Sequence, residues 1–223
     1  MVFEDREDAG RRLAEQLMEY RGAADVRVLG LPRGGVVVAY EVARALGVPL
    51  DVWMVRKIGA PFQPELGMGA LAEGGGLFLD PRIVRMVGAT EDEVAQVTDT
   101  EALELERRIH VFRAGRPRPR LKGCTVILVD DGIATGGTVR AALRAIRAQH
   151  PRRIVLAVPV AAIESLESLA REVDETVCLA PARNLVAVGG WYQNFSQTTD
   201  AEVVALLDAS RQAQVEVGVP SPS

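Results

Sequence analysis

The sequence predicts an α/β fold in which helices cover both faces of a mainly parallel central sheet. Strand-like and helix-like segments alternate along the 223 residues, and such alternation is typical of parallel strands joined by crossover helices. The run Val-Ile-Leu-Val at 126–129 is apolar without interruption, as expected for a strand buried on both faces. The length suits one sizeable core, so we expect a single domain over residues 1–223.

The N-terminal part of the chain is expected to form a helix, a strand, a helix and a strand. Apolar residues at helical spacing predict the first helix over 5–20, and a short apolar run predicts a strand over 26–31. After a Pro-Arg-Gly-Gly turn, a second helix is predicted over 36–46, where Gly-Val-Pro ends it. The next strand is expected over 50–55.

Residues 56–118 are expected to form an insertion made of a flexible loop, a hairpin and a long helix. Glycine and proline recur over 56–76, which favours loop structure. The hairpin strands are predicted at residues 68–72 and 77–79. Thr90 and Glu93 have the spacing of a capping box, and an apolar stripe extends the predicted helix to about Arg113.

The remaining segments alternate again and complete the predicted sheet. Strands are expected over residues 126–129, 154–158 and 175–179, and helices over residues 138–149, 163–172 and 200–211. The last residues, 213–223, lack a periodic pattern and are expected to fray.

Composition argues against two classes of partner. The net charge of −4 disfavours a dedicated nucleic-acid binder. No stretch approaches 18 apolar residues, and the charged N-terminus has no apolar signal core. We therefore expect no membrane partner and a cytoplasmic protein.

The segment after the strand at 126–129 carries the most specific chemistry. Two carboxylates, Asp130 and Asp131, stand where open α/β sheets place ligands. Glycine amides, threonine hydroxyls and the start of a helix follow, and these groups suit an anion. They are Gly132, Thr135, Gly136, Gly137 and Thr138. A phosphate could bind beside a polyol or a metal, which is the chemistry of a sugar phosphate; the alternative is an Asp-Asp-Gly that merely caps a turn.

The string Asp-Asp-Gly-Ile-Ala-Thr-Gly-Gly-Thr at 130–138 resembles the phosphoribosyl pyrophosphate (PRPP) signature of the type I phosphoribosyltransferases. The resemblance implies that Asp130 and Asp131 bind the ribose hydroxyls, directly or with Mg²⁺, as the metal site. It also implies that residues 132–138, including Ile133 and Ala134, hold the 5′-phosphate. Enzymes of 6-oxopurine salvage commonly have an acid where this chain has Ala134, so adenine-type or uracil-type members fit better.

Two further loops resemble parts of the same family. Arg33 and Gly34, after the first strand, correspond to the loop that binds pyrophosphate, although a tight turn is the alternative. Arg56 and Lys57 resemble the Val-Arg-Lys stretch of adenine phosphoribosyltransferases and would balance the diphosphate, with a solvated basic turn as the alternative. The flexible catalytic loop is expected within 59–76, where Glu65 and Glu73 are the available acids.

An aromatic cluster near the C-terminus is the candidate base site. Trp191, Tyr192 and Phe195 lie within five residues, and aromatic rings commonly stack on planar bases. The family builds its variable hood from terminal segments, so we expect the hood at 181–200. A small satellite core or a dimer contact is the competing interpretation of the same residues.

The function implied by the resemblance is transfer of the 5-phosphoribosyl group from PRPP to a nitrogenous base, with release of pyrophosphate. Mg²⁺ is the implied cofactor, PRPP and a base are the implied partners, and a homodimer is expected, with the helix at 91–113 as a candidate contact. A PRPP- or nucleotide-sensing regulator without catalysis is the alternative. A third hypothesis is a different enzyme that acts on a nucleotide or sugar phosphate, and it predicts that the protein does not bind PRPP.

Overall fold

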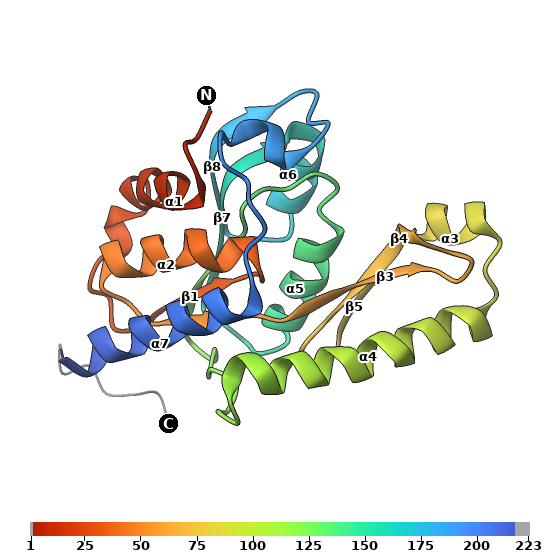
Figure 1. The fold of residues 1–223 in the computed structure, drawn as a ribbon, viewed down its shortest axis with the longest axis horizontal. Coiled ribbons are helices and arrows are strands. Elements are labelled where there is room, and N and C mark those ends of the chain that lie inside the picture. The colour runs from red at the N-terminus through yellow and green to blue at the C-terminus, as the bar shows by residue number, and fades with distance from the viewer. Residues whose placement is uncertain (1, 217–223) are drawn as a thin grey trace. The chain divides into compact units, whose positions relative to one another are not determined.

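The computed structural model describes the chain from residue 2 to residue 216 (Figure 1). The chain divides into two compact units, which are described separately. The first comprises the residues up to Val52, the stretch Arg118–Thr135 and the residues from Gln149 onward. The second comprises Trp53–Pro117 and Gly136–Ala148. None of the helices in the described part of the chain is long and apolar enough to cross a membrane.

The first unit contains a five-stranded sheet, and every pair of neighbouring strands in it is parallel. Its strands, in spatial order, are β2 (Leu50–Val52), β1 (Val26–Gly30), β6 (Thr125–Val129), β7 (Arg153–Ala162) and β8 (Glu175–Ala182). All five residues of β6, the central strand, are buried. The predicted α/β class with a parallel central sheet is thereby confirmed.

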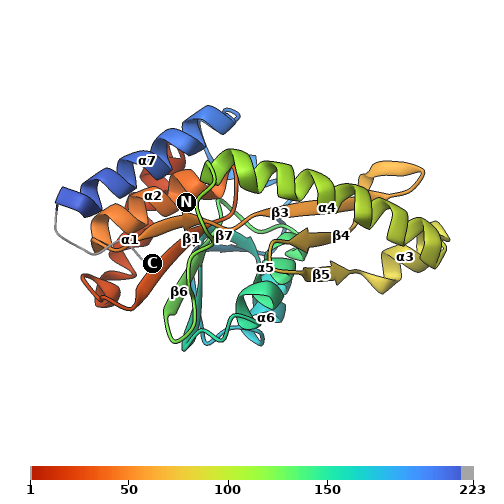
Figure 2. The same ribbon diagram turned by 90° about the horizontal axis from the view of Figure 1, so that it is seen from below.

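Helices cover both faces of this sheet. They are α1 (Arg6–Glu15), α2 (Gly34–Leu46), α6 (Ile163–Ala170) and α7 (Asp200–Glu216). The chain moves outward from β1 to β2 through α2, and in the opposite direction from β7 to β8 through α6. Because parallel crossovers are right-handed, these two opposite moves put α2 and α6 on opposite faces. Figure 2 shows α1, α2 and α7 together, away from α6.

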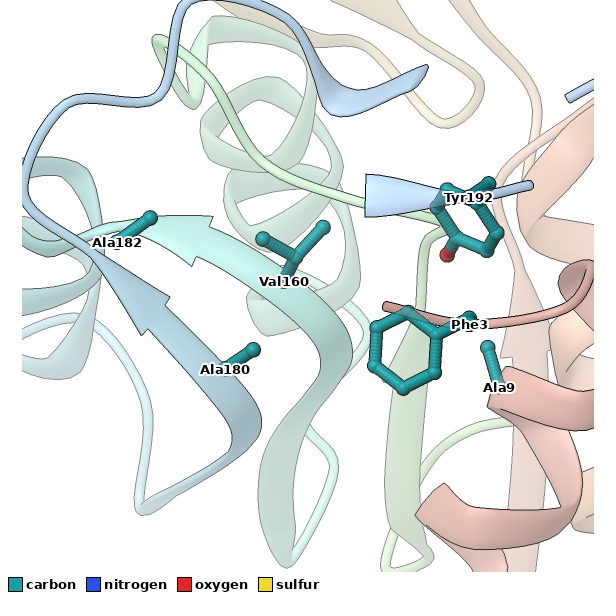
Figure 3. Close-up of a cluster of buried hydrophobic side chains, with 6 residues drawn as sticks. All are labelled: Phe3, Ala9, Val160, Ala180, Ala182 and Tyr192. Carbon is teal, nitrogen blue, oxygen red and sulfur yellow. The ribbon is translucent and has the colours of Figure 1, made fainter. Parts of the chain in front are cut away.

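A satellite core joins the N-terminus to the C-terminal part of the sheet (Figure 3). It consists of the buried side chains of Phe3, Ala9, Val160, Ala180, Ala182 and Tyr192. The rings of Phe3 and Tyr192 lie 5.4 Å apart between centroids. Backbone hydrogen bonds from Phe3 N to Trp191 O (2.8 Å) and from Gln193 N to Phe3 O (2.8 Å) fasten the same segments. The segments around Phe3 and Tyr192 are therefore held together beside β7 and β8.

The second unit contains an antiparallel sheet of three strands with three helices. The strands are β3 (Val55–Ala60), β4 (Gln63–Ala72) and β5 (Gly76–Leu79), and the helices are α3 (Pro81–Val87), α4 (Glu91–Arg113) and α5 (Gly137–Arg147). The capping box of Thr90 and Glu93 begins α4 as predicted. Gly76 allows α5 to approach, because a Cβ there would meet the Ala145 side chain at 2.6 Å.

Three segments differ from the sequence-based expectation. The predicted loop at 56–76 consists largely of β3 and β4, whose backbone groups pair across the ribbon despite the glycines and prolines. The hairpin within it is confirmed, since Leu71 pairs with Leu77. The predicted strand at 50–55 ends at Val52 because its continuation joins the other sheet. Helix α3 was not expected, although Asp80 and Gly88 cap its two ends.

The N- and C-terminal helices also have different bounds from those predicted. Helix α1 ends at Glu15, and the rest of the expected helix is a short 3₁₀ turn, Met18–Tyr20. Helix α7 continues to Glu216, so residues 213–216 of the expected tail are helical. The remainder of that tail lies outside the described residues.

Candidate active site

The paired carboxylates lie at the carboxyl end of the central strand, next to the loop that follows β1. Gly30 pairs with Val129, and Leu31 N donates to Val129 O at 2.9 Å. A Cβ on Gly35 would lie 2.9 Å from Asp130 Oδ1, and a Cβ on Gly34 would collide with the Asp131 carboxylate. The structure thus brings together two sequence-predicted parts that are about 100 residues apart in a chain of 223.

The loop at 32–35 contains a positively charged side chain, Arg33, and the start of a helix. The peptide bond between Pro32 and Arg33 is cis. Helix α2 begins at Gly34, so its first amides open beside this loop. The Arg33 guanidinium lies 3.6 Å from Asp200 Oδ1, with about a third of its side chain exposed. A surface pair of this length is weak, which leaves Arg33 able to bind an incoming anion.

Asp131 is held by a residue that the sequence analysis missed, Arg6 at the start of α1. Arg6 Nε donates to Asp131 Oδ2 at 2.7 Å, and NH1 donates to Ser196 O at 2.8 Å. The guanidinium also stacks over the Phe195 ring, 3.8 Å from its centroid. Asp131 N in turn donates to Asp130 Oδ1 at 2.9 Å. No local pattern links residues 6 and 131, so only the folded chain reveals the pair.

The loop after the aspartates is partly used by the fold itself. Ile133 is buried; its N–H donates to Val160 O at 2.9 Å, and its carbonyl accepts from Ala162 N at 2.8 Å. Its amide is therefore engaged by β7 instead of facing a phosphate. Ala134 and Thr135 are exposed, and the Ala134 carbonyl accepts from Ser165 Oγ at 2.6 Å.

The last three residues of the motif begin α5 in the second unit. Gly136 is the N-cap, with a φ of 76° that favours glycine. Gly137 and Thr138 form the first turn of α5 and are partly exposed. No side chain caps this helix. Its first amides are of the kind that bind anions, and their contact with a phosphate stays a prediction.

Arg56 and Lys57 lie within β3 and not in a loop, which corrects their predicted setting. Arg56 Nε donates to Glu101 Oε2 of α4 at 2.7 Å, and the Lys57 side chain is exposed. Glu73, one of the two acids considered for catalysis, is buried in an ion pair with Arg113. Glu65 is exposed on β4. The contact of Arg56 and Lys57 with a diphosphate stays a prediction.

Tyr192 belongs to the satellite core, which was the alternative to base stacking. Only 6% of the residue is exposed, and its hydroxyl donates to Asp131 O at 2.6 Å. Burial, reinforced by the nearby Asp131 charge, raises the pKa of Tyr192 well above its ordinary value, so the hydroxyl keeps its proton as a donor. Trp191 is half-buried at the edge of the same core, and its contact with a base stays a prediction.

An open cavity of about 450 Å³ adjoins Arg6 within the first unit. Val37 and Leu206 give it apolar walls, and Asn194, Gln197 and Glu202 supply polar groups. Among the described residues, no three His, Cys, Asp or Glu side chains gather closely enough to hold a metal by themselves. Asp130 and Asp131 could supply two carboxylates, and Mg²⁺ commonly takes its other ligands from substrate oxygens and water.

Known proteins resemble this chain over most of its length. Residues 3–180 match the family model described as "Phosphoribosyl transferase domain". "Putative phosphoribosyl transferase Rv0571c" of Mycobacterium tuberculosis is 48% identical over 217 residues, which are 97% of this chain and 49% of that protein. A second M. tuberculosis sequence, from strain CDC 1551, gives the same values. This chain therefore spans about half the length of the curated relatives that it matches.

Two solved structures are also similar to this chain. The crystal structure of TT1426 from Thermus thermophilus is 45% identical and has a TM-score of 0.77, covering 93% of this chain and 98% of that one. The AQ2163 protein from Aquifex aeolicus is 13% identical and has a TM-score of 0.51, with the match covering 79% of this chain and 74% of that one. At this identity the likeness shows a shared fold only. The chain belongs to the phosphoribosyl transferase family.

Proposed function

We propose that the protein transfers the 5-phosphoribosyl group of PRPP to a nitrogen of a base and releases pyrophosphate, as a Mg²⁺-dependent enzyme of nucleotide metabolism. One observation carries the proposal: the Asp130–Asp131 pair and the loop at 32–35 lie against each other at the ends of β6 and β1. This arrangement offers carboxylates to a sugar and amides with a cation to a diphosphate, in a chain of the phosphoribosyl transferase family.

The aspartates act at the ribose. Displacement of pyrophosphate from the anomeric carbon passes through an oxocarbenium-like state, in which positive charge develops on the ring. Asp130 and Asp131 bind the ribose hydroxyls and stabilise that charge more strongly in the transition state than in the ground state. Amides of the segment 132–138 and the N-terminus of α5 hold the 5′-phosphate, with Ile133 contributing through the shape of the loop.

Cations act at the leaving group. Arg33 exchanges its weak pair with Asp200 for the diphosphate, and the Gly34 amide lies at the start of α2 beside it. Arg56 and Lys57 are proposed to add positive charge as the pyrophosphate departs. Bound Mg²⁺ would neutralise part of the diphosphate charge, with Asp130 and Asp131 as the residues able to hold it.

The acceptor is proposed to be a nitrogenous base of a class that needs no acid at position 134, since alanine stands there. The cavity beside Arg6 combines apolar walls with amide groups and is one place of suitable size. Trp191 is the aromatic side chain proposed to contact the base. A homodimer and a cytoplasmic location belong to the same proposal, by family resemblance.

The test measures pyrophosphate release from PRPP, with and without Mg²⁺, over a panel of purine and pyrimidine bases. We expect release that depends on one class of base and on Mg²⁺. PRPP binding without base-dependent release would identify a sensor in place of an enzyme. No PRPP binding under any condition would refute the proposed site.

A further inference from the structure

We infer that Arg6 is a positioning residue of the phosphoribosyl site: it orients Asp131 toward the ribose and offsets one of the two adjacent negative charges. The inference rests on the proposed function and goes beyond it, because Arg6 lies outside every signature segment of the sequence. The feature that carries it is the ion pair between Arg6 Nε and Asp131 Oδ2, at 2.7 Å.

Arg6 is fixed on several sides, unlike an ordinary surface arginine. Its side chain is only 12% exposed, and that of Asp131 is 17% exposed. One nitrogen donates to Asp131, another donates to the carbonyl of Ser196, and the central carbon of the guanidinium lies over the Phe195 ring. The Phe195 ring itself lies 5.0 Å from the Tyr192 ring. Two hydrogen bonds and the ring contact restrict the guanidinium, and its Nε–H in turn restricts the position of Asp131 Oδ2.

Asp131 is held at its backbone as well as at its side chain. Tyr192 Oη donates to the backbone carbonyl of Asp131 at 2.6 Å. A Cβ on Gly34 would lie 2.5 Å from Arg6 Nε and would also strike the Asp131 carboxylate. The Arg6–Asp131 pair therefore borders directly on the loop proposed to bind pyrophosphate, in the space that a side chain at position 34 would fill.

The position of Arg6 in its helix argues against a merely local role. Arg6 is the first residue of α1, where the helix dipole disfavours a cation. Asp5 caps the helix and Glu7 and Asp8 stand in its first turn, which suits the dipole. An arginine among them gains little from the helix, whereas its ion pair removes repulsion between two neighbouring carboxylates. We therefore expect the loss of Arg6 to change the position and the charge environment of the Asp131 carboxylate.

The test compares Arg6→Gln with Arg11→Gln, a control in the same helix whose exposed arginine lies 3.8 Å from Glu7. Calorimetry measures binding of ribose 5-phosphate and of inorganic pyrophosphate, each with Mg²⁺. We expect Arg6→Gln to weaken ribose 5-phosphate binding at least tenfold and pyrophosphate binding less than threefold, with both affinities unchanged in Arg11→Gln. Arg6→Lys should fall between Arg6→Gln and the wild type, because one ammonium cannot serve both acceptors in a fixed plane.

A double-mutant cycle separates positioning from general stability. If Arg6 acts through Asp131, Arg6→Gln should change ribose 5-phosphate affinity less than threefold in an Asp131→Asn background. Equal losses in both backgrounds, or equal losses of both ligands, would overturn the inference. Arg6→Lys takes the place of Arg6→Gln in the cycle if the glutamine variant does not fold.

The wild-type protein distinguishes this inference from the proposed function. If the wild type binds neither PRPP nor ribose 5-phosphate, the proposed function is wrong and the role of Arg6 falls with it. If the wild type binds both and Arg6→Gln binds them equally well, the function stands and only the role of Arg6 is wrong.

Discussion

Two of the arginine–carboxylate pairs, one from each unit, differ in how completely they are enclosed. In the second unit, the side chains of Arg113 and Glu73 are 4% and 1% exposed. Glu73 Oε1 accepts from Arg113 NH2 and from Met54 N, each at 2.8 Å. In the first unit, Arg6 and Asp131 are 12% and 17% exposed and border on a glycine loop.

The difference fits a structural role for the Glu73 pair and the proposed site role for the Asp131 pair. The Glu73 pair ties the β4–β5 turn to the end of α4 and to the residues before β3, and protein groups surround its carboxylate. The Asp131 carboxylate lies instead beside the loop at 32–35, where α2 begins. Arg113 contacts both oxygens of Glu73, whereas Arg6 contacts one oxygen of Asp131. The two pairs therefore differ in geometry as well as in enclosure, and we expect them to differ in use.

Loss of the enclosed pair should have the largest effect. Glu73→Ala leaves Arg113 buried without its carboxylate, and we expect a loss of about 3–5 kcal/mol in the free energy of unfolding. Urea denaturation measures it. The control is Glu104→Ala on α4, where the pairs with Arg107 and Arg108 are open to solvent and the expected change is small. Equal losses of unfolding free energy in the two variants would contradict the structural role of the enclosed pair.

Loss of the site carboxylates should act mainly on turnover, with a cost in stability below that of Glu73→Ala. We expect Asp130→Asn and Asp131→Asn each to lower kcat by about 10²–10³-fold, since a single electrostatic contact to a transition state has that value. Steady-state pyrophosphate release is the measurement, and thermal unfolding is the control. Full activity in both variants would remove the aspartates from the mechanism.

Filling the space at position 34 should disturb the site pair selectively. Gly34→Ala places a methyl group against Asp131 and Arg6, and we expect it to cost about 1–3 kcal/mol through overpacking, together with weaker PRPP binding. Gly67→Ala is the control, because a Cβ there meets nothing within 4 Å. Unchanged PRPP affinity in Gly34→Ala would show that the ligand does not depend on this contact.

The smallest predicted effect concerns pH and the cap of α3. Hydrogen bonds from the side chain and the amide of Arg82 lower the pKa of Asp80 to about 2. A lowered pKa means that the ionised carboxylate stabilises the fold above the unfolded pKa of about 4, and that this stabilisation is lost as pH falls toward 2. Asp80→Ala should therefore cost about 1 kcal/mol near neutral pH and less at a pH close to 2. Urea titrations at both pH values measure the difference; an equal cost at both would contradict it.

Several features were predictable because they depend on neighbours in the sequence. The apolar run of β6 predicts burial on both faces, and the aspartates and glycines after it predict a turn that binds a ligand. The capping box of Thr90 and Glu93 also depends only on residues that are neighbours in the sequence, and so does the start of the helix that follows it. The ribbon of β3 and β4 was not predicted, because its glycines and prolines favour a loop when only the local sequence is considered. Its hydrogen bonds come from pairing between the two strands, which local composition does not indicate. Helix α3 was missed although Asp80, Pro81 and Gly88 are helix-end signals.

The amino-acid sequence was enough to predict the alternation of strands and helices, the family, and the aspartates and loop residues that suit a sugar diphosphate. Only the tertiary structure decided that Arg6 holds Asp131, that Tyr192 is a core residue with its hydroxyl on the loop, and that Glu73 is enclosed with Arg113. The physical reason is distance along the chain. Periodicity and capping are set within one or two turns, whereas an ion pair across 125 residues exists only once packing has brought its partners together.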